Sequence, residues 1–270
     1  WTSRTSAADN FWRQVKWIKE LGLFVAVSSN NALNNAVMTS PDGITWTIRT
    51  TPNANYWNDL AWSAGRGLIV AVASTGTMDR VMTSPDAINW TARVPATDNL
   101  WHGIAWSAEL GLFGAVAYDG TGNRVMTSPD GITWTSRTSA ADNQWLSVAW
   151  SKEFGMFAAV ADDTVSGDGV MYSPDGITWT TATPEINRDW RRVIWIKELG
   201  CFLGVAYYDG STPSGNLIML CRALDTTQQY LNIYGRNTAQ KVIGDVIFKD
   251  KVILSETVLG TAEQGVIETD

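Results

Sequence analysis

An amide or carboxylate side chain precedes a tryptophan at five places in the chain. The five segments read SAADNFW, TPNANYW, PATDNLW, SAADNQW and TPEINRDW. An indole face stacks on the C–H face of a sugar and planar polar groups bind its hydroxyls, so these pairs predict shallow glycan-binding pockets. The candidate ligand-binding residues are Asn10, Trp12, Asn55, Trp57, Asn99, Trp101, Asn143, Trp145 and Trp190, with Tyr118, Asp119, Tyr208 and Asp209 in nearby loops. In the alternative interpretation the asparagines form Asx turns and the indoles pack inside the fold.

Catalytic chemistry is not predicted. His102 is the single histidine, so a Ser-His-Asp arrangement has no support, and no pair of carboxylates stands apart from turn sequences. Asp162, Asp163 and Asp168 are a weak indication of a Ca²⁺ site, because glycine-rich loops commonly carry aspartate. We therefore expect a protein that is not an enzyme and that needs no cofactor or metal.

Charge and hydropathy exclude two classes of partner. The net charge is -7, without the clustered lysine and arginine that phosphate binding requires, so we expect no nucleic-acid partner. No apolar run approaches the roughly 20 residues of a membrane-spanning helix, which predicts a soluble chain without membrane insertion. Cys201 and Cys221 are expected to be buried thiols, with a cross-strand disulfide as the alternative.

The fifteen tryptophans fall into three classes of five, and each class recurs every 44 or 45 residues. The entry tryptophans are Trp12, Trp57, Trp101, Trp145 and Trp190. The exit tryptophans are Trp17, Trp62, Trp106, Trp150 and Trp195. The turn tryptophans are Trp1, Trp46, Trp90, Trp134 and Trp179. This period is typical of propeller blades and solenoid units, and it predicts five copies of one structural unit.

The third copy shows what the unit is. Residues 101–107, 112–118, 124–128 and 132–138 are each rich in β-forming residues and are separated by turn sequences. Four short strands per copy, with no helical periodicity, predict a radial four-stranded antiparallel blade. The chain is therefore predicted to be all-β, with a five-bladed β-propeller over residues 1–225.

The loops between the second and third strands differ between copies, whereas the other turns hardly vary. These loops span residues 28–35, 74–79, 118–123, 162–169 and 207–216. Variable loops on a repeating scaffold are where recognition usually resides, and the connections that carry the entry tryptophans lie on the same face. We place the predicted ligand-binding face there.

A turn sequence ending in a turn tryptophan recurs in four copies, and we name it the SPD turn. It reads SPDGITW at 40–46, 128–134 and 173–179, and SPDAINW at 84–90. It resembles the Asp-box, or BNR, repeat of sialidase-like β-propellers, shortened by one residue between aspartate and glycine. The serine and aspartate oxygens can accept turn N–H groups while the indole packs over the hairpin, so the predicted role is structural.

The resemblance raises a glycosidase or sialidase-like enzyme as a less favoured reading. Asp-box sialidases have six blades, a central arginine triad, a tyrosine nucleophile and a supporting glutamate. Here the arginines on the predicted inner strands are only Arg13, Arg191 and Arg192. The resemblance therefore extends to the fold and not to the enzyme's residues.

The ring is predicted to close through its amino-terminal strand. Residues 1–10 are identical to residues 134–143, and the last copy lacks the SPD turn and fourth strand after residues 216–223. Residues 1–6 are thus a fourth strand with no blade before them, and we predict that they complete blade five, which removes two free sheet edges. The alternative is that residues 226–234 pair there.

Residues 226–270 depart from the repeat and form a predicted β-rich extension. Their alternation of β-formers, glycine and charge resembles strand-and-turn segments of phage and viral tail fibres, where near-identical Asp-box repeats are also frequent. The resemblance implies an attachment protein on a virion surface or outside cells, which binds a glycan or cell-surface receptor and forms a homo-oligomer through the extension. A protein–protein interaction scaffold is the alternative.

Overall fold

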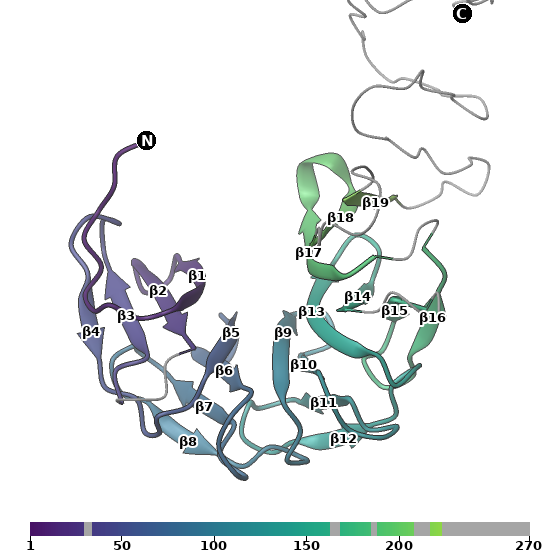
Figure 1. Ribbon diagram of the computed structural model, residues 1–270, viewed down its shortest axis with the longest axis horizontal. Coiled ribbons are helices and arrows are strands. Elements are labelled where there is room, and N and C mark those ends of the chain that lie inside the picture. Colours follow the sequence, from purple (N-terminus) through teal and green to yellow (C-terminus); the bar gives the residue numbers. More distant parts are fainter. Residues whose placement is uncertain (30–33, 163–167, 185–187, 208–216, 223–270) are drawn as a thin grey trace, which may run out of the picture.

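The computed structural model describes residues 1–29, 34–162, 168–184, 188–207 and 217–222, and it is a five-bladed β-propeller (Figure 1). Blade one contains β1 (Trp12–Ile18), β2 (Leu23–Ser28), β3 (Val37–Ser40) and β4 (Thr47–Arg49). Blade two contains β5 (Trp57–Ser63), β6 (Leu68–Ala73), β7 (Val81–Ser84) and β8 (Thr91–Arg93). Blade three contains β9 (Trp101–Ser107), β10 (Leu112–Ala117), β11 (Val125–Ser128) and β12 (Thr135–Arg137).

The last two blades follow the same order. Blade four contains β13 (Gln144–Ser151), β14 (Met156–Asp162), β15 (Val170–Ser173) and β16 (Thr180–Ala182). Blade five contains β17 (Trp190–Ile196), β18 (Cys201–Ala206) and β19 (Ile218–Arg222), with the 3-10 helix η1 (Lys197–Leu199) between the first two strands. All neighbouring strands pair antiparallel, so the all-β class and the five-bladed propeller predicted from the tryptophan period are confirmed.

The SPD turns are hydrogen-bonded hairpin turns, as their sequence predicts. In blade one, Ser40 Oγ accepts the Gly43 N–H at 2.8 Å, and Asp42 Oδ1 accepts the N–H groups of Ile44 and Thr45, each at 2.8 Å. The Trp46 indole N–H donates to the Gly43 carbonyl at 3.3 Å, which fixes the ring over the turn. The carboxylate is therefore used in local structure.

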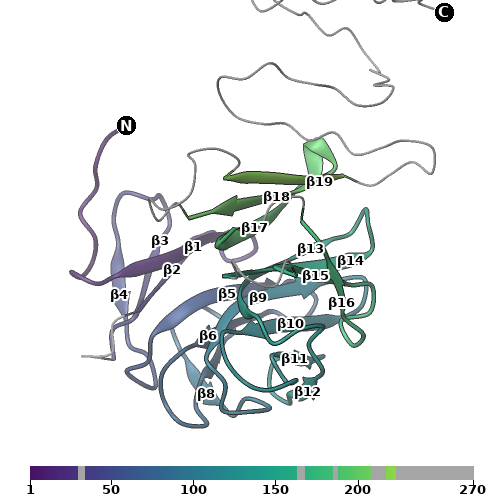
Figure 2. The same cartoon turned by 45° about the vertical axis from the view of Figure 1, so that its right-hand side comes forward.

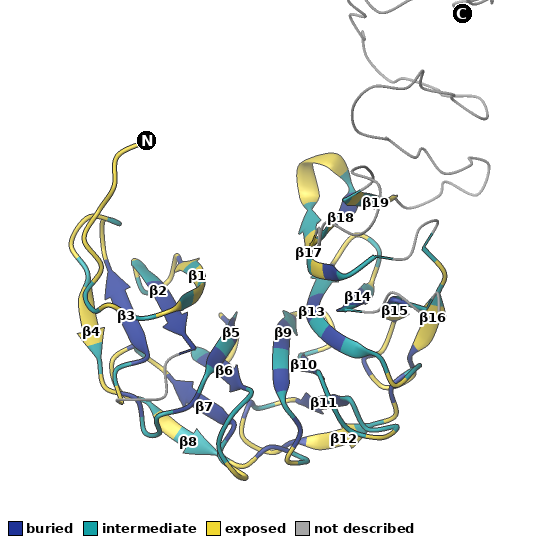
Figure 3. Cartoon of the chain, viewed as in Figure 1, coloured by how far each residue is buried: buried dark blue, intermediate teal, exposed yellow. Residues whose placement is uncertain are grey.

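The hydrophobic core lies between the blades rather than within them. We call the face of a blade that packs on the preceding blade its front face, and the opposite face its back face; each contact between blades is a seam. In the seam between blades one and two, Val25, Val27 and Val37 from the back face of blade one pack against Trp57 and Leu60 from the front face of blade two. Equivalent clusters fill the next three seams. Figure 3 shows buried inner strands such as β2, β3 and β7, and the exposed outer strands β4 and β12.

Blade five and the amino terminus differ from the predicted closure. Residues 1–6 are exposed and belong to no strand, and within the described residues blade five has three strands. Figures 1 and 2 show the amino terminus and β19 on opposite sides of an opening between blades one and five. The four filled seams connect blade one to blade five through the other three blades, and they hold these two blades apart (Figure 1). The alternative closing segment 226–234 and the extension 226–270 lie outside the described residues.

The remaining expectations concern thiols, metals and membranes. Cys201 and Cys221 are both free, but only Cys201 is buried, so the expectation of a buried thiol is wrong for Cys221 on the exposed edge strand β19. Across the described ranges, no cluster of three histidine, cysteine, aspartate or glutamate side chains is placed to hold a metal. The same part of the chain contains no helix long and apolar enough to cross a bilayer.

Candidate functional site

The entry tryptophans fill the seams. Trp57, Trp101, Trp145 and Trp190 are almost completely buried, and only Trp12, whose blade has no neighbour on its front face, is partly exposed. A buried indole offers no face on which a sugar can stack. The shallow glycan pockets predicted between blades are therefore occupied by the tryptophans themselves, and sequence could not show this because the same residue suits a platform or a core.

The asparagines before the entry tryptophans tie two loops of one blade together. Each donates its side-chain N–H to a backbone carbonyl of the loop between the second and third strands. The pairs are Asn10 with Asn35, Asn55 with Asp79, Asn99 with Asn123, and Asn143 with Asp168, at 2.9–3.1 Å. The asparagine N–H groups are thus used in structure, but these contacts join loops 24 or 25 residues apart and are not the local Asx turns of the alternative interpretation.

Of the other predicted site residues, Tyr118 and Asp119 lie at the same end of the propeller. Asp119 accepts the Leu100 N–H at 2.6 Å, and the partly exposed Tyr118 ring lies 5.4 Å from the His102 ring. Burial, and next the charge of Arg13, lower the pKa of His102 to about 4, although Asp119 opposes this. The histidine is thus neutral at pH 7 and is a packing partner of Tyr118. Tyr208 and Asp209 lie outside the described residues.

A β-bulge at the start of every first strand determines which side chains reach the propeller axis. In all five blades the register shifts by one residue just after the entry tryptophan. A bulge re-aims the next side chain. The residues after the bulge are Gln14, Asp59, Gly103, Ser147 and Arg192.

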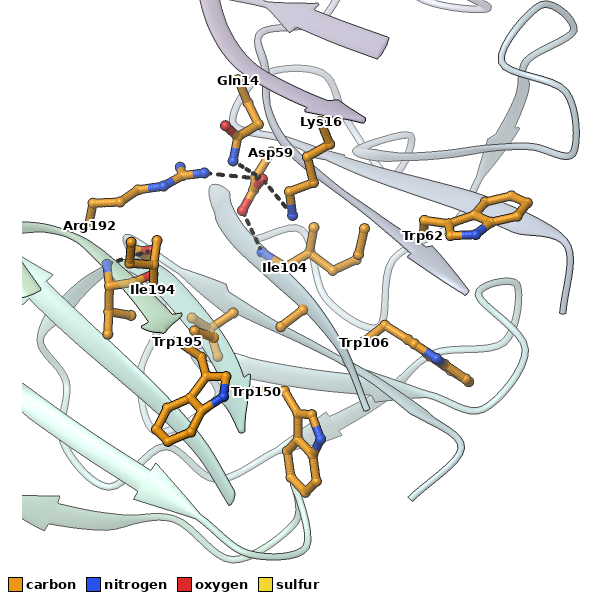
Figure 4. Close-up of a pocket in the computed structure, with 16 residues that line it drawn as sticks. Gln14, Lys16, Asp59, Trp62, Ile104, Trp106, Trp150, Arg192, Ile194 and Trp195 are labelled. Atoms are coloured by element: carbon orange, nitrogen blue, oxygen red, sulfur yellow. Dashed lines mark hydrogen bonds and ion pairs between the residues drawn. The ribbon is translucent and has the colours of Figure 1, made fainter. Parts of the chain in front are cut away.

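Asp59 is the centre of a polar group that it forms with Gln14, Arg192 and the nearby Lys16 (Figure 4). Its carboxylate is almost completely buried and accepts the Leu60 N–H at 2.8 Å, the Gln14 Nε2–H at 2.9 Å and the Ile104 N–H at 3.3 Å. A buried carboxylate needs such donors because removing it from water is otherwise costly. Asp59 is thereby held in one position on the axis.

Two cations approach the same carboxylate from opposite sides of the opening. Lys16 Nζ on blade one lies 3.6 Å from Asp59 Oδ1, and an Arg192 Nη on blade five lies 3.7 Å from it. Both distances exceed a hydrogen bond, and both cationic side chains are partly exposed. Two positive charges therefore share one negative charge, and their N–H groups have donor capacity left for a ligand.

Exit tryptophans line the other end of the same cavity. Figure 4 shows Trp62, Trp106, Trp150 and Trp195 around it, and all four indoles are partly buried. Trp62 and Trp150 donate their indole N–H groups to glutamates of the preceding blade at 2.9 and 2.8 Å. The cavity has a volume of about 560 Å³. It combines a charged end with an aromatic end.

A second cationic group lies near the charged end. Arg191 forms an ion pair with Asp162 at 2.9 Å and lies over the Tyr207 ring, with its guanidinium carbon 5.3 Å from the ring centroid. Arg13 donates to Ser29 Oγ at 2.8 Å. These two arginines are engaged by the loops, whereas Arg192 faces the cavity. The inner-strand arginines thus separate into two groups, as their sequence positions alone do not reveal.

The site residues predicted from the sequence do not include Asp59, Lys16 and Gln14. A signal for them existed in the aligned first strands, which read WRQVKW, WNDLAW, WHGIAW, WLSVAW and WRRVIW. The two tryptophans and the apolar residue at the fourth position recur, whereas the second, third and fifth positions vary. Gln14 and Asp59 hold the third position, directly after the bulge, and Lys16 holds the fifth, so variation between copies marks these positions together with the second.

No family model matches the chain, and no curated protein matches it. Many solved structures are similar in fold, and three of them are the following. YCF48 bound to a D1 peptide has a TM-score of 0.52 at 14% identity over 73% of this chain, which spans 60% of that chain. YCF48 from Cyanidioschyzon merolae has a TM-score of 0.57 at 12% identity over 84% of this chain and 72% of its own. A nidogen/laminin complex has a TM-score of 0.51 at 12% identity over 68% of both chains. These likenesses support the propeller fold.

Proposed function

We propose that this chain is a non-enzymatic, protein-binding propeller that takes a segment of a partner protein into its central cavity. The observation that carries the proposal is the cavity's lining, with the partly exposed cations Lys16 and Arg192 at one end and four exit tryptophans at the other. Arginine and tryptophan are enriched among residues that dominate protein interfaces. The cavity's volume of about 560 Å³ falls in the range of roughly 300–1,000 Å³ usual for ligand sites.

The comparisons favour a protein partner over the glycan reading. One similar structure holds a D1 peptide and another is a complex of nidogen with laminin, so propellers of this general shape bind peptides and proteins. An enzyme is disfavoured by the use of Asp59, which accepts three N–H groups and is not free to act as a base. The proposed role is therefore binding.

Glycan recognition by a virion or extracellular attachment protein remains the second candidate. The observation in its favour is the set of partly exposed exit indoles, which replace the buried entry indoles as possible stacking platforms. A glycan site here would use Trp106 and Trp150 and not Asn99 and Trp101.

Selection from a random linear peptide library on phage, run beside a glycan array with the multimerised full chain, tests both candidates. We expect peptides that bind the wild type and that lose at least about tenfold in affinity with Arg192→Met or Trp106→Leu, because central interface residues commonly contribute 2 kcal/mol or more. Trp46→Leu is the matched control, since this indole is also partly buried but lies outside the cavity.

Each outcome decides between the candidates. Binding peptides that are insensitive to both cavity variants would place the protein-binding site elsewhere. Glycan hits lost with Trp106→Leu, in the absence of peptide hits, would support the second candidate. Melting curves of all three variants separate lost binding from lost folding.

A further inference from the structure

The front face of blade one is uncovered at a position that every other blade buries. Val15 of β1 is 52% exposed. Its counterparts, Leu60, Ile104, Val148 and Val193, are 0%, 1%, 5% and 4% exposed. Trp17 on the same strand is also half exposed. The apolar residue is retained at this position, but no blade in the described part of the chain covers it.

The back face of blade five is uncovered in the same way. Ile194, Val205 and Ile218 are 46%, 39% and 57% exposed. Their counterparts in blade two are the buried Ala61, Val72 and Val81. Three exposed aliphatic side chains on adjacent strands β17, β18 and β19 form one apolar surface. Surfaces of this kind in soluble proteins mark interaction sites.

The two uncovered faces are the two halves of one seam. In the filled seam between blades two and three, Ala61, Val72 and Val81 pack in the same cluster as Trp101 and Ile104. The back face of blade five presents the kind of surface that Ala61, Val72 and Val81 form. The front face of blade one presents the kind that Trp101 and Ile104 form. Each therefore fits the other, and neither is self-complementary.

The amino-terminal strand supplies a second, independent complementarity. Residues 134–139 have the same sequence as residues 1–6, and there Thr135–Arg137 form β12, pair with β11 and lead directly into blade four. The strand that carries this sequence, β12, is thus the fourth strand of blade three, and the residues after it enter blade four. If blade one of a second copy packs on blade five, residues 1–6 of that copy reach the edge of β19. Among the described residues, no fourth strand pairs with this edge.

We propose that the occupant of the open seam is a second copy of this chain, docked head to tail, with blade one of one copy on blade five of another. Closure within one chain would require the four filled seams to rotate, which disturbs fully buried indoles such as Trp101 and Trp145, whereas a second copy docks without such changes (Figure 1). The contact is heterologous, because two different surfaces meet.

The molar mass of the full chain, measured by sedimentation equilibrium over a wide concentration range, tests the proposal. We expect the wild type to associate, and Val15→Glu and Ile218→Glu each to weaken association at least about tenfold, because a charge would be buried in the seam. Ile44→Glu is the matched control, since Ile44 is also 52% exposed but lies in an SPD turn. It should associate as the wild type does.

Mixing the two variants distinguishes head-to-tail docking from other modes of association. Val15→Glu retains an intact back face and Ile218→Glu an intact front face, so an equimolar mixture should form dimers that neither variant forms alone. Deletion of residues 1–6 should weaken wild-type association without abolishing it.

Three results would overturn the proposal. One is a wild type with the mass of a single chain at every concentration. Another is association unaffected by Val15→Glu, which would assign it to another surface such as the extension 226–270. The third is a mixture that fails to associate although both variants keep the wild-type circular dichroism spectrum.

Discussion

The seam between blades three and four and the open seam between blades five and one contain the same kinds of residue. In the first, Trp145 and Val148 pack against Val116 and are buried. In the second, Trp12 and Val15 hold the same repeat positions and are partly or half exposed. The difference shows that a blade of this protein does not bury its own apolar face. As in other repeat architectures, each unit depends on its neighbour, so the two terminal blades are the least supported.

The sharpest contrast is expected between equivalent entry tryptophans. Trp145→Ala should reduce the free energy of unfolding by about 3–5 kcal/mol, because it removes a fully buried indole from a filled seam. Trp12→Ala should cost much less, about 1–2 kcal/mol, because its indole is already partly exposed. Urea unfolding followed by circular dichroism measures both. Equal losses would show that the open seam is covered in solution.

A smaller contrast is expected between the aliphatic positions of blades one and two. Leu60→Ala should cost about 2–5 kcal/mol, whereas Val15→Ala should stay within about 0.5 kcal/mol. Unfolding should be measured at protein concentrations where the protein has the mass of one chain, since docking of a second copy would bury Val15. A large effect of Val15→Ala under those conditions would contradict the open seam.

The aspartates of the SPD turns should be indifferent to the state of the seam, because their hydrogen bonds stay within the turn, which makes them a control for the comparison. Although burial raises the pKa of the Asp86 carboxyl, the N–H groups of Asn89 and Ile88 outweigh it and lower the pKa from 3.8 to about 2. The carboxylate therefore stabilises the fold above pH 3.8, and this contribution is lost as the pH falls through about 2.

We expect Asp86→Asn to lower the melting temperature at pH 7 by about 2–4 °C, and the difference from wild type to shrink below pH 3.8. Asp42→Asn in blade one should also lower the melting temperature at pH 7, since N–H donation from Thr45 and Ile44 lowers the pKa of Asp42 too. Thermal melts across this pH range measure both. If Asp42→Asn had no effect at pH 7, the SPD turn of blade one would contribute less to stability than the SPD turn of blade two.

The fold was predictable because its determinants are local and repeated. The spacing of the tryptophans and the SPD turns fixes strands, turns and blade number, each within a few residues of sequence. The site was less predictable for two reasons. The one-residue bulge breaks the alternation of the strand, since Trp57 and Leu60 share a face, but this break does not say that Asp59 or Arg192 turns toward the axis. Whether Trp101 is buried and Val15 is exposed depends on the neighbouring blade. Whether residues 1–6 close the ring, as expected from the sequence, depends on it as well.

Asp59 gives the open ring a mechanical property. Blades one and five do not pack on each other, yet Lys16 and Gln14 from one rim and Arg192 from the other all reach this single carboxylate. Blades one and five are thus connected across the opening mainly by ion pairs to Asp59. Salt weakens these ion pairs because both cations are partly exposed. We expect spin labels on β4 and β19 to report a wider gap as ionic strength rises, and no such widening in Asp59→Asn. The width of the opening would then depend on the surrounding electrolyte, through rotations in the four filled seams that are far smaller than closure of the ring would need.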